Sequence, residues 1–231
     1  MQVHKSVREL NARRGTSIKA PDKKKTATFI LSCATVGGAV YLALEAALPL
    51  SPLKRGHELA VFCGFFLTPL AILLATKRKP ELGKFDRGFF EGLGLYMLFL
   101  VPLLFLIPLN KEFFWGYRMA PATAVIWAFY TFIQVSSVDF FTKRIVQLEV
   151  WQAWGKSWGL AAQFAAWSGA HVIEYMWLKD LAGPAGAILF LGTTGALTGL
   201  LYLRTKNVLG MMVGHWLLNL ILAGVAVIFF G

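Results

Sequence analysis

The sequence has little charge, few acidic residues and almost no cysteine. Only 15% of its 231 residues are charged, with 12 Asp and Glu together, whereas 57% are hydrophobic. Soluble globular domains carry about 25% charged and about 45–50% apolar residues, so this composition excludes a water-soluble domain. Both cysteines, Cys33 and Cys63, lie inside apolar runs. A disulfide scaffold is therefore excluded, and we expect both thiols to be buried as small hydrophobic groups.

The chain also lacks an internal repeat, a low-complexity segment and a linker long enough to separate two domains. Its first 26 residues hold eight Lys and Arg but no apolar core of a secretory signal. We therefore predict a basic cytoplasmic segment over residues 1–26 and a single transmembrane domain over residues 27–231. The net charge of +11 falls in short clusters between apolar runs rather than along one face, which predicts no nucleic-acid partner.

Seven stretches are apolar and long enough to cross a membrane as helices. About 20 helical residues span the hydrocarbon core, where backbone polar groups need partners within the protein. The approximate limits are 27–50, 57–76, 88–109, 120–140, 158–177, 183–203 and 208–230. Residues 142–157 mix polar residues with tryptophans, which predicts an amphipathic or re-entrant helix. The predicted fold class is an all-α, polytopic transmembrane helical bundle.

Lys and Arg residues are distributed unevenly between the predicted loops. With a cytoplasmic N-terminus, the inside segments hold 18 of the 23 Lys and Arg, and the outside segments hold five. The positive-inside rule then predicts an integral protein of the inner or plasma membrane, with the N-terminus inside and the C-terminus outside. The basic segment either contacts anionic headgroups of the lipid bilayer or acts only as a solvated topology signal.

Few ionisable or strongly polar residues lie inside the predicted spans, where they are costly and mark candidate sites. They are Asp139, His171, Glu174, His215 and Asn219. Residues four apart share a helix face, so His215 and Asn219 can act together, and Asp139 can pair with Lys143. His171 and Glu174, three apart, can pair in the same way. The depths of Asp139, His171 and His215 predict one cavity that opens to the cytoplasm, although each His can also serve helix packing alone.

Two of these positions lie in motifs that resemble a known family. Residues 167–171 read WSGAH, with Trp167 four residues before His171, and residues 214–219 read GHWLLN, with His215 four residues before Asn219. This pattern is similar to the type II CAAX prenyl endopeptidase and bacteriocin-processing family, the CPBP or "abortive infection" intramembrane proteases. The resemblance covers about residues 120–230. It implies a helical intramembrane protease fold over that half of the chain.

The family's first motif is changed in this sequence. Its two Glu and its Arg correspond to Val138, Asp139 and Lys143. In the family the first Glu is thought to activate a water, while His and Asn side chains orient that water and stabilise the oxyanion. A general base needs a lone pair within reach of the water, and Val138 has none. Asp139 can substitute only if the helix rotates or the water shifts, because adjacent helical positions point about 100° apart.

The residues therefore leave more than one function open. The first hypothesis is an intramembrane endopeptidase that cleaves a membrane-associated protein or peptide near the cytoplasmic face. Its residues are Asp139 as base, His171, His215 and Asn219 for the water and oxyanion, and Lys143, Trp167 and Glu174 as support. The second is an inactive relative that acts as a binding or structural subunit for a membrane protein, lipid or pigment. A small transporter is a third interpretation.

No cofactor is required by the first hypothesis. Two weaker alternatives remain: a divalent metal ion at His171, His215 and Asp139, or a metal-containing pigment at His171 or His215.

Overall fold

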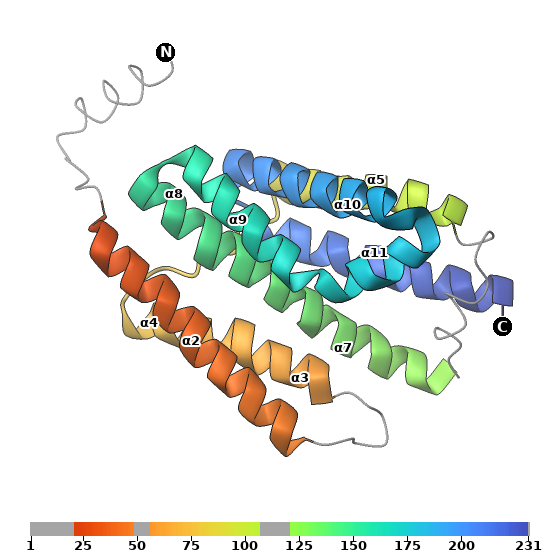
Figure 1. Cartoon of the computed structure of the whole chain (residues 1–231), viewed down its shortest axis with the longest axis horizontal. Coiled ribbons are helices and arrows are strands. Elements are labelled where there is room, and N and C mark those ends of the chain that lie inside the picture. Colours follow the sequence, from red (N-terminus) through yellow and green to blue (C-terminus); the bar gives the residue numbers. More distant parts are fainter. Residues whose placement is uncertain (1–20, 49–55, 107–120, 231) are drawn as a thin grey trace, which may run out of the picture.

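A computed structural model describes residues 21–48, 56–106 and 121–230, and every regular element within them is helical (Figure 1). No strand occurs in these ranges, which confirms the all-α prediction for the described part. Most of the predicted basic segment over residues 1–26 lies outside the described residues. Asp22 caps the first helix, because its side chain accepts hydrogen bonds from the backbone N–H groups of Lys24 and Lys25.

The helices follow one another with short connections. In chain order they are α2 (Lys23–Ala47), α3 (Gly56–Phe62), the π-helical turns η1 (Cys63–Leu67), α4 (Thr68–Ala75), α5 (Arg87–Leu106), α7 (Pro121–Asp139), the π-helical turns η4 (Phe140–Gln147), α8 (Leu148–Trp154), α9 (Lys156–Ala170), α10 (Val172–Thr205) and α11 (Val208–Phe230). Elements α3, η1 and α4 form one continuous rod, and α7, η4 and α8 form another.

Four helices are long and apolar enough to cross a membrane: Lys23–Ala47, Gly56–Ala75, Arg87–Phe105 and Ala182–Thr205. They coincide with the predicted spans 27–50, 57–76, 88–109 and 183–203. These helices identify the chain as a membrane protein. The predicted spans 120–140 and 208–230 correspond to helices α7 and α11, but seven spans and the direction of the chain stay predictions.

The predicted span over residues 158–177 is not one continuous helix. Helix α9 has 15 residues and ends at Ala170, because His171 adopts φ −111° and ψ 22°. About 20 residues are needed to cross the hydrocarbon core, so α9 is too short to do so untilted. A second break follows at Gly183, where φ is 73° and Pro184 starts the next helical segment of α10.

Helices α5 and α11 pack with their backbones almost in contact. A Cβ atom added at Gly210 would lie 2.2 Å from the Phe89 carbonyl oxygen, and one added at Gly92 would lie 2.9 Å from the Gly210 carbonyl carbon. Gly210 and Gly214 are four apart on α11, which is the small-residue spacing that lets membrane helices approach closely. This crossing brings Tyr96 of α5 against His215 of α11, with ring centroids 4.8 Å apart.

The segment predicted to be an amphipathic or re-entrant helix, residues 142–157, is helical through η4 and α8 as far as Trp154. Lys143, Arg144 and Gln147 are buried rather than turned to a membrane surface. They lie in η4, which continues α7 into the protein, and Gln147 donates from Nε2 to the Gly199 carbonyl at 2.7 Å. The spacing predicted the partner of Lys143, which is Asp139, whereas the partners of Arg144 and Gln147 come from α8, α10 and the loop after α4 and are not revealed by the local sequence pattern.

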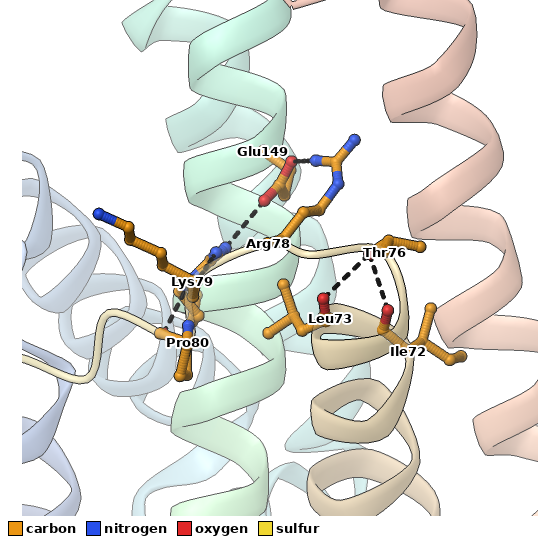
Figure 2. Close-up of polar contacts among 8 residues, drawn as sticks. Ile72, Leu73, Thr76, Arg78, Lys79, Pro80 and Glu149 are labelled. Carbon is orange, nitrogen blue, oxygen red and sulfur yellow. Dashed lines mark hydrogen bonds and ion pairs between the residues drawn. The ribbon is translucent and has the colours of Figure 1, made fainter.

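One of those partner sets fastens the loop after α4 to α8. Figure 2 shows Glu149 beside Arg78, and its carboxylate accepts hydrogen bonds from Arg78 and, at 2.9 Å, from Arg144. Arg144 also donates to the carbonyl oxygens of Lys79 and Pro80. Glu149 is 2% exposed and Arg144 is 3% exposed, so this is a buried network. Its role is structural, because both cations and the carboxylate are fully engaged.

Candidate functional site

Asp139 is the centre of a buried polar cluster at the junction of α7 and η4. Its Oδ1 accepts hydrogen bonds from Lys143 Nζ at 2.6 Å and from the Tyr96 hydroxyl at 3.1 Å. Its Oδ2 lies 3.2 Å from His215 Nδ1, which donates to it. Asp139 and Lys143 are both 0% exposed. The four side chains come from α5, α7, η4 and α11, so the cluster ties these helices together.

Aromatic and imidazole rings cover one side of this cluster. His215 stacks on Tyr96 with an interplanar angle of 9°, and His171 stacks on Trp167 at 3.9 Å between centroids. The two imidazoles are nearly parallel, 6.0 Å apart with an angle of 18°. His215 thus contacts Asp139 directly and His171 lies next to His215, whereas their use as one site stays a prediction.

The hydrogen bonds define which imidazole nitrogens remain available. His171 Nδ1 lies 2.8 Å from the Trp167 carbonyl oxygen, which can only accept, so Nδ1 carries the proton. His215 Nδ1 likewise donates to the Asp139 carboxylate. In the neutral rings both Nε2 atoms then keep their lone pairs. The site therefore holds two imidazole acceptors, of which His171 is only 6% exposed.

Lys143 has a second partner besides Asp139. Its Nζ lies 4.4 Å from the centroid of the Trp167 ring, within the range of a cation–π interaction. Trp167 is 2% exposed and is fixed in turn by Gly195, where an added Cβ would lie 2.6 Å from the indole Cδ1. Trp167, predicted as a support residue from its motif, thus separates the ammonium group from His171.

The cluster is packed rather than open. Asp139, Lys143 and Trp167 are almost completely buried, and Val138 is half-buried against the hydrophobic core. Both carboxylate oxygens of Asp139 already accept hydrogen bonds. Tyr96, Trp167 and the Lys143 side chain pack around the Asp139 carboxylate, and the predicted cavity that opens to the cytoplasm stays a prediction.

Two predicted site residues stay outside this hydrogen-bonded cluster. Asn219 is half-buried one turn after His215, and the bonds around Asp139 do not include it. Glu174 lies beyond the helix break at His171, so the helical spacing that would pair these two residues is lost. One Glu174 carboxylate oxygen is buried without a hydrogen-bond partner among the described residues.

Tyr96 is the site residue that the sequence prediction missed. Its hydroxyl donates to Asp139 and its ring stacks on His215, and it is 2% exposed. A tyrosine inside an apolar span carries no motif of its own. The glycines at 92, 210 and 214 are the available signal, because they indicate that α5 and α11 pack closely at this level.

The metal alternative gains no support from this geometry. Among the described residues, no group of three or more His, Cys, Asp or Glu side chains is arranged to hold a metal ion. The Asp139 carboxylate, which that alternative uses with His171 and His215, already pairs with an ammonium group. A pigment alternative would need an imidazole Nε2 as the metal ligand, and the hydrogen bonds of His171 and His215 use only their Nδ1 atoms.

Comparisons of the chain with protein-family models, with characterised proteins and with solved structures find no match. What the site does is therefore argued from its geometry and its chemistry.

Proposed function

We propose that this chain is a non-catalytic membrane protein whose CPBP-like motif residues form a structural and binding centre within a membrane complex. The observation that carries the proposal is the state of Asp139, which is 0% exposed and is held by Lys143, Tyr96 and His215. In this state both carboxylate oxygens of Asp139 already accept hydrogen bonds from side chains of the protein.

General-base catalysis needs a lone pair within hydrogen-bond reach of the attacking water. Asp139 would have to leave Lys143, and breaking a buried ion pair costs about 3–5 kcal/mol. The position that corresponds to the first Glu of the family is Val138, which packs against the hydrophobic core. Both routes to an activated water are therefore unfavourable, which favours a structural role for the centre.

The same centre is well suited to a structural role. It joins α5, α7, η4, α9 and α11 through one carboxylate, one ammonium group and two imidazoles. Large exposed apolar side chains surround it on the outside of the bundle, and Phe105, Phe129 and Leu189 are 74%, 61% and 71% exposed. In a bilayer this surface meets lipid or a neighbouring membrane protein, which is the partner class that we assign.

We also propose seven spans in an inner or plasma membrane, with the N-terminus inside and the C-terminus outside. The start of α2, the end of α4, the turn between α8 and α9 and the end of α10 lie together at one end of the bundle (Figure 1). Basic residues lie at these places, including Lys23, Lys77, Lys156 and Arg204. The positive-inside rule assigns that end to the cytoplasm.

A second candidate is the endopeptidase, and one observation favours it. Three residues predicted for catalysis, Asp139, His171 and His215, come from different helices and still converge. A conformation that opens the cluster would bring a carboxylate and two imidazoles to one water, with Asn219 one turn away. This candidate requires Asp139 to act as the base.

Cleavage of co-expressed candidate membrane substrates distinguishes the two. We expect the parent protein to show no cleavage and Val138→Glu to show cleavage. Adding His215→Ala to Val138→Glu should abolish that cleavage. Val138→Gln, which has a similar size without a carboxylate, is the matched control and stays silent. Cleavage by the parent that disappears in both His215→Ala and Asp139→Asn would contradict the non-catalytic proposal and favour the endopeptidase.

A further inference from the structure

Two lysines, one at the turn between α8 and α9 and one at the end of α10, lie around a single tryptophan ring. Lys156 Nζ lies 5.5 Å and Lys206 Nζ lies 5.0 Å from the centroid of the Trp151 ring. Lys156 is the first residue of α9, whereas Lys206 follows α10 in a left-handed conformation with φ 52°. Two distant parts of the sequence thus bring their ammonium groups to one indole, at distances typical of cation–π contacts.

No carboxylate among the described residues neutralises the positive charge of this pair. Both lysines are exposed, and neither forms an ion pair with a carboxylate among the described residues. Glu149, on the same helix as Trp151, is already held by Arg78 and Arg144. Two ammonium groups at one ring repel each other, so an anion that binds both lowers the electrostatic energy of the pair.

The backbone at the same place adds to this preference for an anion. Helix α9 has 15 residues, starts after Gly155 with φ 103° and has no side-chain cap, so its first N–H groups are free to bind an acceptor. Trp151 is also held in place by α9, because Gly159 packs so closely on it that an added Cβ would lie 2.8 Å from the Trp151 Cβ atom. α9 therefore packs directly on the residue whose ring carries both lysines.

Exposed tryptophans flank the two lysines. Trp154 is 36% exposed and Trp158 is 66% exposed, and tryptophans of this kind concentrate at the level of lipid headgroups. The α8–α9 turn also lies at the end of the bundle where α2 starts and α10 ends (Figure 1). A phosphate beside a tryptophan at this level belongs to a phospholipid more readily than to a soluble anion.

We propose that Lys156, Lys206 and Trp151 form a binding site for the phosphate of an anionic phospholipid, with Trp154 and Trp158 against its glycerol and upper acyl region. Both lysines donate to the phosphate oxygens, and both ammonium groups lie beside the Trp151 ring. The site depends on the membrane location of the chain and not on whether the Asp139 centre is catalytic.

The test is lipid binding by the full chain purified in a neutral detergent, measured by native mass spectrometry during titration with phosphatidylglycerol. We compare the parent with Lys156→Gln/Lys206→Gln. Each basic residue near a lipid surface contributes about 1 kcal/mol, so the double variant is expected to bind phosphatidylglycerol about 30-fold more weakly. Lys156→Arg/Lys206→Arg keeps both positive charges and is expected to retain most of the affinity.

The matched control is Lys23→Gln/Lys77→Gln, which removes two exposed lysines, one at the start of α2 and one after the end of α4, and leaves Lys156, Lys206 and Trp151 unchanged. The control is expected to bind like the parent, and phosphatidylcholine is expected to bind much more weakly than phosphatidylglycerol. Equal losses in both double variants would overturn the site, because general surface charge would then explain binding. Displacement of the lipid by millimolar inorganic phosphate would overturn the assignment to a phospholipid.

Discussion

Lys143→Met removes the ammonium group from the buried Asp139 carboxylate while it keeps most of the volume of the side chain. Lys143 Nζ lies 2.6 Å from Asp139 Oδ1, and neither side chain is exposed. Loss of one partner leaves an uncompensated charge, which costs about 3–5 kcal/mol in buried pairs. Tyr96 and His215 still donate to Asp139, so we expect a loss near the lower end of that range.

The coupling between the two residues gives a sharper value than the single variant. Asp139→Asn removes the negative charge and should also destabilise the protein, because Lys143 is then buried without a counter-ion. In Asp139→Asn/Lys143→Met both charges are gone. The double variant is therefore expected to lose about 2 kcal/mol less than the sum of the single losses, within the range of about 0.5–3 kcal/mol measured for contacting pairs.

The assay is reversible unfolding by SDS from neutral mixed micelles, followed by tryptophan fluorescence. Lys84→Met is the control, because Lys84 is exposed and its substitution should change the unfolding free energy by no more than about 0.5 kcal/mol. If Lys143→Met costs no more than this control, or if the single losses simply add, the buried ion pair does not hold the centre together. The proposed state of Asp139 would then be wrong.

Three further predictions concern the helix contacts and the topology. Gly210→Ala should destabilise the protein by about 1–3 kcal/mol, because its Cβ would lie 2.2 Å from the Phe89 carbonyl oxygen. Gly94→Ala is the control and should not destabilise it, because no atom lies within 4 Å of the added Cβ. Equal SDS-unfolding midpoints for the two variants would contradict the close crossing of α5 and α11. Arg144→Gln removes the hydrogen bonds to Glu149, Lys79 and Pro80 and should speed hydrogen exchange in the loop after α4. Arg87→Gln is the control, because the Arg87 side chain is 91% exposed, and it should leave hydrogen exchange in that loop unchanged. Alkaline phosphatase fused to the C-terminus should be active in a bacterial host, because the enzyme folds only outside the cytoplasm. Activity of a fusion in the 77–87 loop instead would place that loop outside and contradict the proposed direction of the chain in the membrane.

Sequence patterns predicted those features of this chain that depend on composition and on spacing within one helix. The four apolar runs that became candidate spans were visible in this way, and the i,i+4 pair of Asp139 and Lys143 is confirmed at 2.6 Å. The convergence of His171 and His215 followed from their depth in the predicted spans. Each of these inferences needed only the rise of a helix and the width of a membrane.

Features that depend on neighbouring helices were not visible. The helix break at His171, which ends α9 within the predicted span, was missed because backbone φ and ψ at a His cannot be inferred from hydropathy. Residues 142–157 were predicted to form an amphipathic or re-entrant helix, but the hydrogen bonds of the buried Arg144 to Glu149 and two loop carbonyls were not visible. Tyr96 was missed for the same reason, since its partner Asp139 is 43 residues away along the chain.

The charge balance at the centre explains why an uncharged Val138 occurs together with Lys143. Asp139 contributes one negative charge and Lys143 one positive charge, so the buried pair is neutral. A second carboxylate at position 138 would add an unpaired negative charge beside the core, at a cost of several kcal/mol. Arginine at position 143 can donate to two carboxylates through its planar fork, whereas a lysine ammonium is a compact point charge. The Val138 and Lys143 pair therefore suits a centre with a single carboxylate, in which the charge stabilises helix packing instead of activating a water.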